Sequence, residues 1–305
     1  MALSPSPLRI SLIIATYNRS RQLLTTLQSV VRQDLPADEW ECVVVNNRST
    51  DDTPAAFAAF AAAHPECRLR IVDEPQAGLS HARNRGIAEA QALLLVFIDD
   101  DEWIEPQFLR AYADFFEAHP EVSAAGGPIV AEYPEGRPAW LSRYPEVAIA
   151  NVMNFGPKPC PFPAGRVPGG GNTALRRTVF EACGVFDPQF GRVGTRLTGG
   201  EENELFERIM QQGHRLWYVP KAVMHHVIPA AKLTESYFRN LCRNIGLNQR
   251  RRARIHRRQL RTCIAEIAKW GATLLLCCMM RPVQARWLLR MRFEISRGVF
   301  ARPEK

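Results

Sequence analysis

The sequence lacks the features that would assign it to several common protein classes. Its eight cysteines are scattered, with no C-x-x-C pair, and only Cys277 and Cys278 are neighbours. This spacing indicates neither a zinc site nor a disulfide framework, and it favours reduced thiols in a cytosolic protein. Residues 1–9 contain no apolar segment typical of a secretory signal, so we expect a cytoplasmic protein.

Long apolar runs are also absent. The segment from Trp270 to Met280 is apolar, but it is shorter than the roughly 20 residues that cross a bilayer. Apolar residues make up 46% of the chain and charged residues 23%, which argues against general disorder. With 305 residues, the chain is long enough for one large α/β domain and an appended segment.

Acidic residues are missing from one basic segment. Nine arginines and no acid lie between Arg239 and Arg261, in a chain of net charge +8. Such a segment indicates an anionic partner, either a membrane surface or a nucleic acid, unless it forms a merely solvated helix face. No aromatic residue interleaves the arginines between 250 and 261, so no stacking platform for bases is visible and nucleic acid is disfavoured.

The last predicted helix is basic and amphipathic. Leu288, Met291, Ile295 and Val299 fall on one helical face, with arginines opposite and Trp287 beside the apolar stripe. This pattern suits a membrane interface. Docking of the same stripe onto the catalytic domain is the alternative.

Strand-like and helix-like segments alternate in the first third of the chain. Short apolar runs predict strands, and amphipathic segments between them predict helices, the first of which Ser20 can cap. The predicted strands are residues 10–14, 41–45, 68–72 and 93–98, and the helices after the first are 53–63 and 80–90. This alternation predicts a mostly parallel, doubly wound sheet flanked by helices.

Polar clusters follow three of these strands. They comprise residues 16–18, 46–51 and the acidic triplet Asp99, Asp100 and Asp101. In doubly wound sheets, ligands bind beyond the carboxyl ends of the strands, so we expect these clusters to meet at one site. Three adjacent carboxylates are costly unless a cation or a proton relieves their charge, and Mg²⁺ or Mn²⁺ shared by Asp99 and Asp101 would do so.

The order of these motifs resembles glycosyltransferase family 2. The matching segments are 13–19 (IIATYNR), 45–51 (VNNRSTD), 82–86 (ARNRG), 97–101 (FIDDD), 171–176 (GNTALR), 184–187 (GVFD), 200–205 (GEENEL) and 223–225 (VMH). The resemblance therefore covers about residues 8–230. It implies the A-type glycosyltransferase fold, with inversion at the sugar carbon.

The resemblance also implies a nucleotide-sugar site. Tyr17 would stack on the nucleobase, with Ala15 and Thr16 lining the same pocket, while Asn47 would read the base and Arg83 would face the nucleotide. Asp99 and Asp100 would approach the ribose and the metal, and Asp101 would be the principal metal ligand. Gly171 and Asn172 complete the predicted sugar-nucleotide residues, and His225 matches the position that completes the metal shell, a structural histidine being the alternative.

The predicted general base is Glu202. An acceptor hydroxyl needs a carboxylate to take its proton, and the family places an Asp at this position ahead of a helix. A helix N-terminus favours the ionised form that a base requires, and Glu201 would orient a substrate. Acids that only stabilise the helix start are the alternative. The sequence departs from the family pattern in two places: Asn46-Asn47 replaces an acidic pair, and Glu202 replaces Asp.

We therefore expect a catalytic domain over residues 1–230 and a basic amphipathic helical extension over 231–305. The predicted activity is metal-dependent inverting transfer from a nucleotide-diphosphate sugar to a glycan or lipid-linked acceptor in cell-envelope synthesis. We expect a cytoplasmic enzyme that can be peripheral on the inner face of the plasma membrane. A non-catalytic sugar-nucleotide-binding module of the same fold is the alternative.

Overall fold

The computed structural model describes residues 8–193 and 199–301, which form two compact units. Within these residues, the first unit contains 8–130, 153–189 and 201–227. The second contains 131–152, 190–193, 199–200 and 228–301. Each unit is described by itself below.

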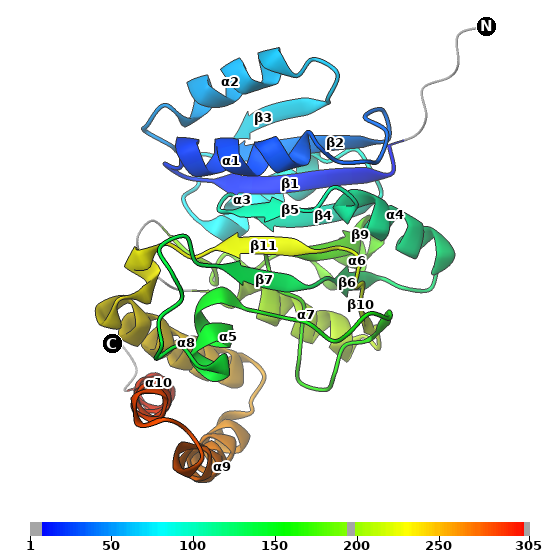
Figure 1. The fold of residues 1–305 in the computed structure, drawn as a ribbon. Coiled ribbons are helices and arrows are strands. Elements are labelled where there is room, and N and C mark those ends of the chain that lie inside the picture. The colour runs from blue at the N-terminus through cyan, green and yellow to red at the C-terminus, as the bar shows by residue number, and fades with distance from the viewer. Residues whose placement is uncertain (1–7, 194–198, 302–305) are drawn as a thin grey trace, which may run out of the picture. The chain divides into compact units, whose positions relative to one another are not determined.

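An eight-stranded sheet with the order β3-β2-β1-β4-β9-β6-β10-β8 forms the centre of the first unit (Figure 1). Strands β1 to β4 are mutually parallel, whereas β9 runs antiparallel to both β4 and β6. The strands are β1 (Ile10–Thr16), β2 (Trp40–Asn46), β3 (Leu69–Asp73), β4 (Leu94–Asp99), β6 (Ala124–Gly126), β8 (Cys160–Pro161), β9 (Thr173–Arg176) and β10 (Leu216–Tyr218).

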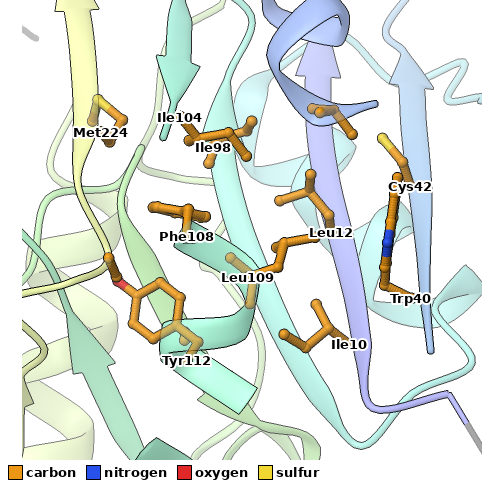
Figure 2. Packing of buried hydrophobic residues seen from close by; sticks show 14 of the residues in the cluster. Ile10, Leu12, Trp40, Cys42, Ile98, Ile104, Phe108, Leu109, Tyr112 and Met224 are labelled. Atoms are coloured by element: carbon orange, nitrogen blue, oxygen red, sulfur yellow. The ribbon is translucent and has the colours of Figure 1, made fainter. Parts of the chain in front are cut away.

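Helices cover both faces of this sheet because side chains alternate along each strand. Leu12 of β1 belongs to the apolar cluster that contains α1, α2 and α4, whereas Ile13 belongs to the cluster on the side of α3, α6 and α7. Figure 2 shows Leu12 close to Leu109 of α4. The helices are α1 (Ser20–Val30), α2 (Thr53–Ala63), α3 (Leu79–Glu89), α4 (Phe108–Ala118), α6 (Arg177–Cys183) and α7 (Glu201–Gln211).

A glycine brings α3 against the sheet at the edge that carries the polar clusters. A Cβ on Gly86 would lie 2.3 Å from Cγ2 of Ile13, so any larger residue would push the helix away from β1. Arg83 lies one turn earlier on the same helix. The close packing of α3 therefore fixes the position of the Arg83 side chain relative to the end of the sheet.

A small second sheet follows the acidic triplet. Its order is β5-β11-β7, with β5 (Glu102–Ile104), β11 (Met224–Val227) and β7 (Ile129–Glu132). Strands β5 and β11 are antiparallel, with His225 opposite Trp103 and His226 opposite Glu102. This register decides which of the two histidines is directed toward the triplet.

The second unit is helical. It contains α5 (Arg143–Ala150), the 3₁₀ helix η1 (Ala230–Leu233), α8 (Glu235–Ile255), α9 (Gln259–Cys278) and α10 (Pro282–Val299). Helices α8 and α10 touch through two glycines. A Cβ on Gly246 would lie 2.0 Å from the carbonyl oxygen of Ile295, and one on Gly298 would lie 2.2 Å from that of Arg243. The two backbones are thus in direct contact.

The mostly parallel sheet flanked by helices, followed by a helical C-terminal region, confirms the predicted fold class. One local prediction was wrong: helix α1 begins at Ser20, so Arg19 occupies the cap position, and its side chain makes no capping hydrogen bond. For the α10 stripe of Leu288, Met291, Ile295 and Val299, the sequence left membrane binding and docking open. In the structure all four side chains are buried in the core of the second unit.

Candidate active site

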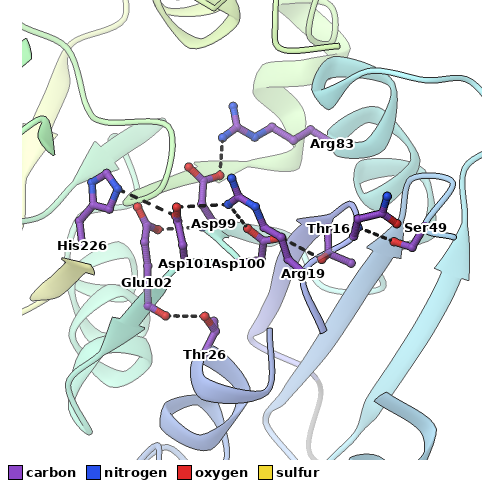
Figure 3. Close-up of polar contacts among 11 residues, drawn as sticks. Thr16, Arg19, Thr26, Ser49, Arg83, Asp99, Asp100, Asp101, Glu102 and His226 are labelled. Atoms are coloured by element: carbon purple, nitrogen blue, oxygen red, sulfur yellow. Dashed lines mark hydrogen bonds and ion pairs between the residues drawn. The ribbon is translucent and has the colours of Figure 1, made fainter. Parts of the chain in front are cut away.

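The acidic triplet lies at the carboxyl end of β4, beside the end of β1. Asp100 is buried and accepts hydrogen bonds from Thr16 Oγ1 and Arg19 Nη1, both at 2.8 Å. Arg19 Nη1 also lies 3.2 Å from Oδ2 of Asp101 (Figure 3). Burial raises the pKa of Asp100 to about 6, against the opposing charge of Arg19. Thr16, the last residue of β1, and Arg19, from the loop that follows it, therefore hold the triplet in place.

Arg83 connects the triplet to the start of α7. Its Nη2 donates to Asp99 Oδ1 at 2.9 Å, and its Nη1 donates to Glu201 Oε1 at 2.8 Å. The guanidinium is buried, and a Cβ on Gly170 would lie only 3.0 Å from Nη2. A buried Arg paired with two carboxylates sets a fixed distance between them. The chain thus brings residues 99 and 201 to one cluster although they are far apart in sequence.

The two acids at the start of α7 have different surroundings. Glu201 is buried against Arg83, and burial raises the pKa of its carboxyl, with the charge of Glu202 acting in the same direction and Arg83 opposing both. Glu202 is half-buried and accepts a 3.3 Å hydrogen bond from Asn203 Nδ2. Glu201 is therefore held in an internal ion pair, whereas Glu202 remains partly exposed.

The structure directs His226, not His225, toward the triplet. His226 Nε2 lies 3.9 Å from Asp101 Oδ1. His225 stacks on Trp103, with ring centroids 3.6 Å apart, and its Nε2 lies 3.3 Å from Glu105 Oε1. Successive residues of a strand point to opposite faces, so only one of the two histidines can reach Asp101.

Three predicted residues are engaged in structural hydrogen bonds or close packing. The amide of Asn47 donates to the carbonyl oxygens of Glu74 and Gln76 and accepts from the N–H of Gly78, which fixes the loop before α3. Asn172 is buried, where it accepts from Tyr112 and donates to two backbone carbonyls. A Cβ on Gly171 would lie 2.1 Å from a carboxylate oxygen of Glu102.

The remaining predicted residues lie at the end of β1 and in the loop that follows it. Ala15 is half-buried near the end of the strand, and Tyr17, in the loop, is 44% exposed. Asn18 adopts a left-handed backbone conformation, and its side-chain oxygen accepts from the N–H of Thr50. This bond joins the loop after β1 to the loop after β2. The exposed ring of Tyr17 is thereby presented at the surface, where a planar ligand could stack on it.

Sequence reasoning assigned no role to Arg19, Glu102 or His226. Arg19 lies within the motif after β1, but its contact with Asp100, 81 residues later, is long-range and gives no signal in the sequence. Glu102 extends the acidic run, and its buried carboxylate accepts a 2.7 Å hydrogen bond from the N–H of Asp99, which fixes the start of the triplet. His226 could be found only from the pairing of β11 with β5.

The donor chemistry of the triplet fits a divalent cation. Carboxylate oxygens suit both Mg²⁺ and Mn²⁺, whereas an imidazole suits a transition metal better than Mg²⁺. Asp99 and Asp101 would supply the oxygens and His226 the imidazole. In the conformation described for residues 8–193 and 199–301, no three acidic, histidine or cysteine side chains converge as a metal site. Arg19 and Arg83 neutralise the carboxylates here.

Comparison with known proteins connects this geometry to one family. The model of the family described as Glycosyl transferase family 2 matches residues 11–184, more than half of the chain. A glucosyl-dolichyl phosphate glucuronosyltransferase of Haloferax volcanii is 26% identical over 231 residues, covering 72% of this chain and 69% of that protein. Another curated relative, 34% identical over 109 residues, is covered over only 30% of its own length.

Solved structures show the same fold. The mannosyltransferase PcManGT from Pyrobaculum calidifontis, solved with GDP-Man and Mn²⁺, aligns with a TM-score of 0.64 and 19% identity over 99% of this chain and 91% of that one. Residues 1–349 of TarS from S. aureus, solved with UDP-GlcNAc, align with a TM-score of 0.53 and 17% identity, over 79% and 66% of the two chains. Both neighbours are nucleotide-sugar enzymes by their names and bound ligands.

Proposed function

Because the chain belongs to glycosyl transferase family 2, we propose that it is an inverting glycosyltransferase that moves a sugar from a nucleotide-diphosphate donor to an acceptor hydroxyl. The observation that carries the proposal is the pair of hydrogen bonds through which Arg83 joins Asp99 to Glu201. This link places the acidic triplet and the start of α7 in one cluster. Donor binding and deprotonation of the acceptor would therefore occur at one site.

The donor is proposed to bind at the ends of β1 and β4. Tyr17 would stack on the nucleobase, with Ala15 and Thr16 beside it, while Asp99 and Asp100 would approach the ribose. Asn47 and Gly171 would shape the pocket indirectly, through the loop before α3 and through contact with Glu102. Asn172 is fully engaged within the core, so we do not include it among the contact residues.

The proposed metal site contains Asp99, Asp101 and His226, because His226 rather than His225 lies beside the triplet. When bound there, Mn²⁺ or Mg²⁺ would neutralise the diphosphate as it departs. Arg19 and Arg83 contact the same carboxylates and would have to share them with the cation. The use of Mn²⁺ by the structural neighbour solved with GDP-Man supports this proposal.

Glu202 is the proposed general base. Its carboxylate would take the proton of the acceptor hydroxyl as the hydroxyl oxygen attacks the anomeric carbon, and the bond to the diphosphate would break on the opposite side. The nucleoside diphosphate would leave with the bonding electrons. Glu201, paired with Arg83, would orient the start of α7 and so position Glu202.

The proposed division of labour places the chemistry in residues 1–230 and substrate or surface association in 231–305. A relative named for action on a dolichyl phosphate supports a lipid-linked acceptor, used in building a cell-envelope glycan on the cytoplasmic side. Among residues 8–193 and 199–301, no helix combines the length and apolarity needed to cross a bilayer.

The test is calorimetric titration of the full chain with GDP and with UDP, each with and without Mn²⁺. We expect one nucleotide to bind in a metal-dependent manner, and Asp101→Ala to abolish that dependence. Replacing the exposed Glu121 by Ala provides a matched control that removes one carboxylate elsewhere on the first unit. Wild-type affinity in Asp101→Ala would refute the metal assignment.

Turnover distinguishes an enzyme from a binding module. The full chain should hydrolyse or transfer from the donor whose nucleotide binds, and a chelator should stop the reaction. Tight metal-dependent nucleotide binding with no turnover of any donor sugar would instead identify a non-catalytic sugar-nucleotide-binding module.

A further inference from the structure

Helix α9 has its polar residues inside and its apolar residues outside. Its two fully buried side chains are Glu266 and Thr273. Glu266 accepts from Arg292 Nη1 at 3.0 Å and from Ser296 Oγ at 2.9 Å, and Thr273 Oγ1 accepts from Arg292 Nε at 3.3 Å. Trp270 adds a 2.9 Å hydrogen bond to Ser296. Polar contacts therefore attach α9 to α10.

The opposite face of α9 is apolar and exposed. Its residues recur at helical spacing, so they form one continuous stripe along the helix. We define the α9 apolar face as Leu260 (76% exposed), Ile264 (59%), Ile267 (66%), Leu274 (55%), Leu275 (68%) and Met279 (81%). The α10 stripe, for which the sequence left membrane binding and docking open, is buried. The apolar face of α9 is the exposed one.

A continuous exposed stripe of this kind needs a partner. Single exposed apolar residues are normal on protein surfaces, but contiguous apolar patches mark sites that bind another molecule or a membrane. The stripe follows the full length of a 20-residue helix. A helix of that length is about 30 Å long at 1.5 Å per residue, so the partner must offer an extended apolar surface.

The charges around α9 identify the kind of partner. Between residues 239 and 301 the sequence has fourteen arginines and one lysine, against two glutamates. Both glutamates, Glu266 and Glu294, are buried and paired with arginine. This part of the chain therefore presents cationic groups and no carboxylate side chain to its surroundings. Anionic headgroups complement such a surface.

Exposed arginines lie at both ends of the apolar face. Arg254, Arg257, Arg258 and Arg261 lie before or at its beginning, and Arg281 and Arg286 follow its end. If a second copy of the chain packed face to face with the first, these cationic ends would oppose one another, which is unfavourable. A lipid layer can cover the apolar face with its acyl chains and pair its anionic headgroups with the arginines at both ends.

We propose that α9 lies in the interface of an anionic lipid bilayer, with its apolar face in the acyl boundary and its flanking arginines among the headgroups. A basic amphipathic helix parallel to the membrane surface buries its apolar side without crossing the bilayer. Membrane attachment through α9 is independent of the proposed sugar transfer, because none of its residues belongs to the carboxylate cluster.

The test is flotation of the full chain with vesicles of phosphatidylcholine alone and with vesicles containing about one third phosphatidylglycerol. We expect binding to the anionic vesicles, weakened as the salt concentration rises. Ile264→Glu with Leu275→Glu should weaken that binding by about tenfold or more, since both lost side chains supply buried apolar area. Both positions are exposed, so the fold should be retained.

A matched control separates the apolar contacts from net charge. Leu93→Glu with Val185→Glu introduces the same two negative charges at exposed apolar positions of the first unit, and it should retain most of the vesicle binding. Equal binding by the α9 variant and this control would overturn the proposal. A second outcome would also overturn it. If the wild type is a dimer in sedimentation equilibrium, the α9 variant is a monomer, and neither protein floats with vesicles, then the α9 apolar face joins two copies of the chain. Nucleotide binding by the α9 variant should be unchanged.

Discussion

The acidic triplet at the end of β4 and helix α9 depart from the ordinary distribution of side chains in opposite directions. At the triplet, charged groups are buried and held by Arg19 and Arg83. At α9, apolar groups are exposed while a glutamate is buried. Buried charge is costly unless it is paired, and an exposed apolar stripe is costly unless it is covered. The comparison teaches that burial of a carboxylate does not by itself identify a ligand site, because Asp100 lies in the candidate site whereas Glu266 attaches α9 to α10.

The largest expected effect concerns turnover at the cluster. Glu202→Gln keeps the shape of the side chain but removes its ability to take a proton, so the turnover number should fall by roughly a hundredfold or more. Donor affinity and thermal stability should stay near the wild-type values. Steady-state kinetics and donor titration measure the two effects separately. If Glu201→Gln loses turnover while Glu202→Gln is active, the base is the neighbouring residue.

Substitution of the buried acid of α9 should have the opposite effect, lowering stability and leaving turnover unchanged. Glu266→Ala leaves Arg292 without its main partner, and breaking such a pair costs about 3 kcal/mol. Amide hydrogen exchange along α9 and α10 should report this loss of local stability, with turnover on a soluble acceptor unchanged. Glu266→Leu combined with Arg292→Met should restore much of the protection, because it removes both charges. If the double variant loses as much protection as Glu266→Ala, packing rather than charge holds the two helices together.

The buried acid of the triplet should also make stability depend on pH. Burial raises the pKa of Asp100 to about 6, whereas an Asp in an unfolded chain titrates near pH 3.9. Between these values the folded state binds more protons than the unfolded chain, so this contribution to stability is present at low pH and is lost as pH rises through the window.

Relative to Asp100→Asn, the wild type should therefore lose about 3 kcal/mol between about pH 4 and pH 7. Urea denaturation at a series of pH values, without added metal or nucleotide, measures the difference. Asp52→Asn, which removes an exposed carboxylate, controls for the loss of one charge. Parallel pH profiles for the wild type and Asp100→Asn would contradict the raised pKa.

The smallest effect distinguishes two adjacent histidines. His226→Ala should weaken Mn²⁺-dependent nucleotide binding on the order of tenfold, a typical scale for groups that orient or complete a metal site. His225→Ala removes a ring that stacks on Trp103 and should lower thermal stability while leaving metal affinity nearly unchanged. Titration of Mn²⁺ into each variant with saturating nucleotide gives the comparison. Reversed effects would return the metal role to His225.

Much of the first unit was predictable because local patterns and the fold agree there. The helix at 53–63 has the predicted bounds, and each of the first four strands lies within two residues of its predicted limits. The acidic triplet was recognisable because three carboxylates directly follow an apolar strand. These features depend on neighbouring residues, and their positions follow from the periodicity of single strands and helices.

The remaining features depend on contacts between distant segments. Which histidine approaches Asp101 is decided by the pairing of β11 with β5. The burial of Asn172 depends on Tyr112 and two carbonyls that lie at least 44 residues away. Periodicity shows that α10 is amphipathic, but it cannot say which molecule covers the apolar stripe, and in the structure α8 and α5 contribute to its cover. For α9, the usual rule that charged side chains are exposed and apolar ones buried does not hold, because Glu266 is buried.

The glycine contact between α8 and α10 has a consequence for how this sequence can vary. Even alanine at position 246 or 298 would force two backbones apart, since its methyl group would lie 2.0 or 2.2 Å from a carbonyl oxygen, far inside normal contact distance. In a saturation mutagenesis screen, these two sites should tolerate as few substitutions as the carboxylates of the triplet. Intolerance to substitution would thus also mark a place where no ligand binds. To tell helix packing from a role in the site, folding must be measured separately from turnover.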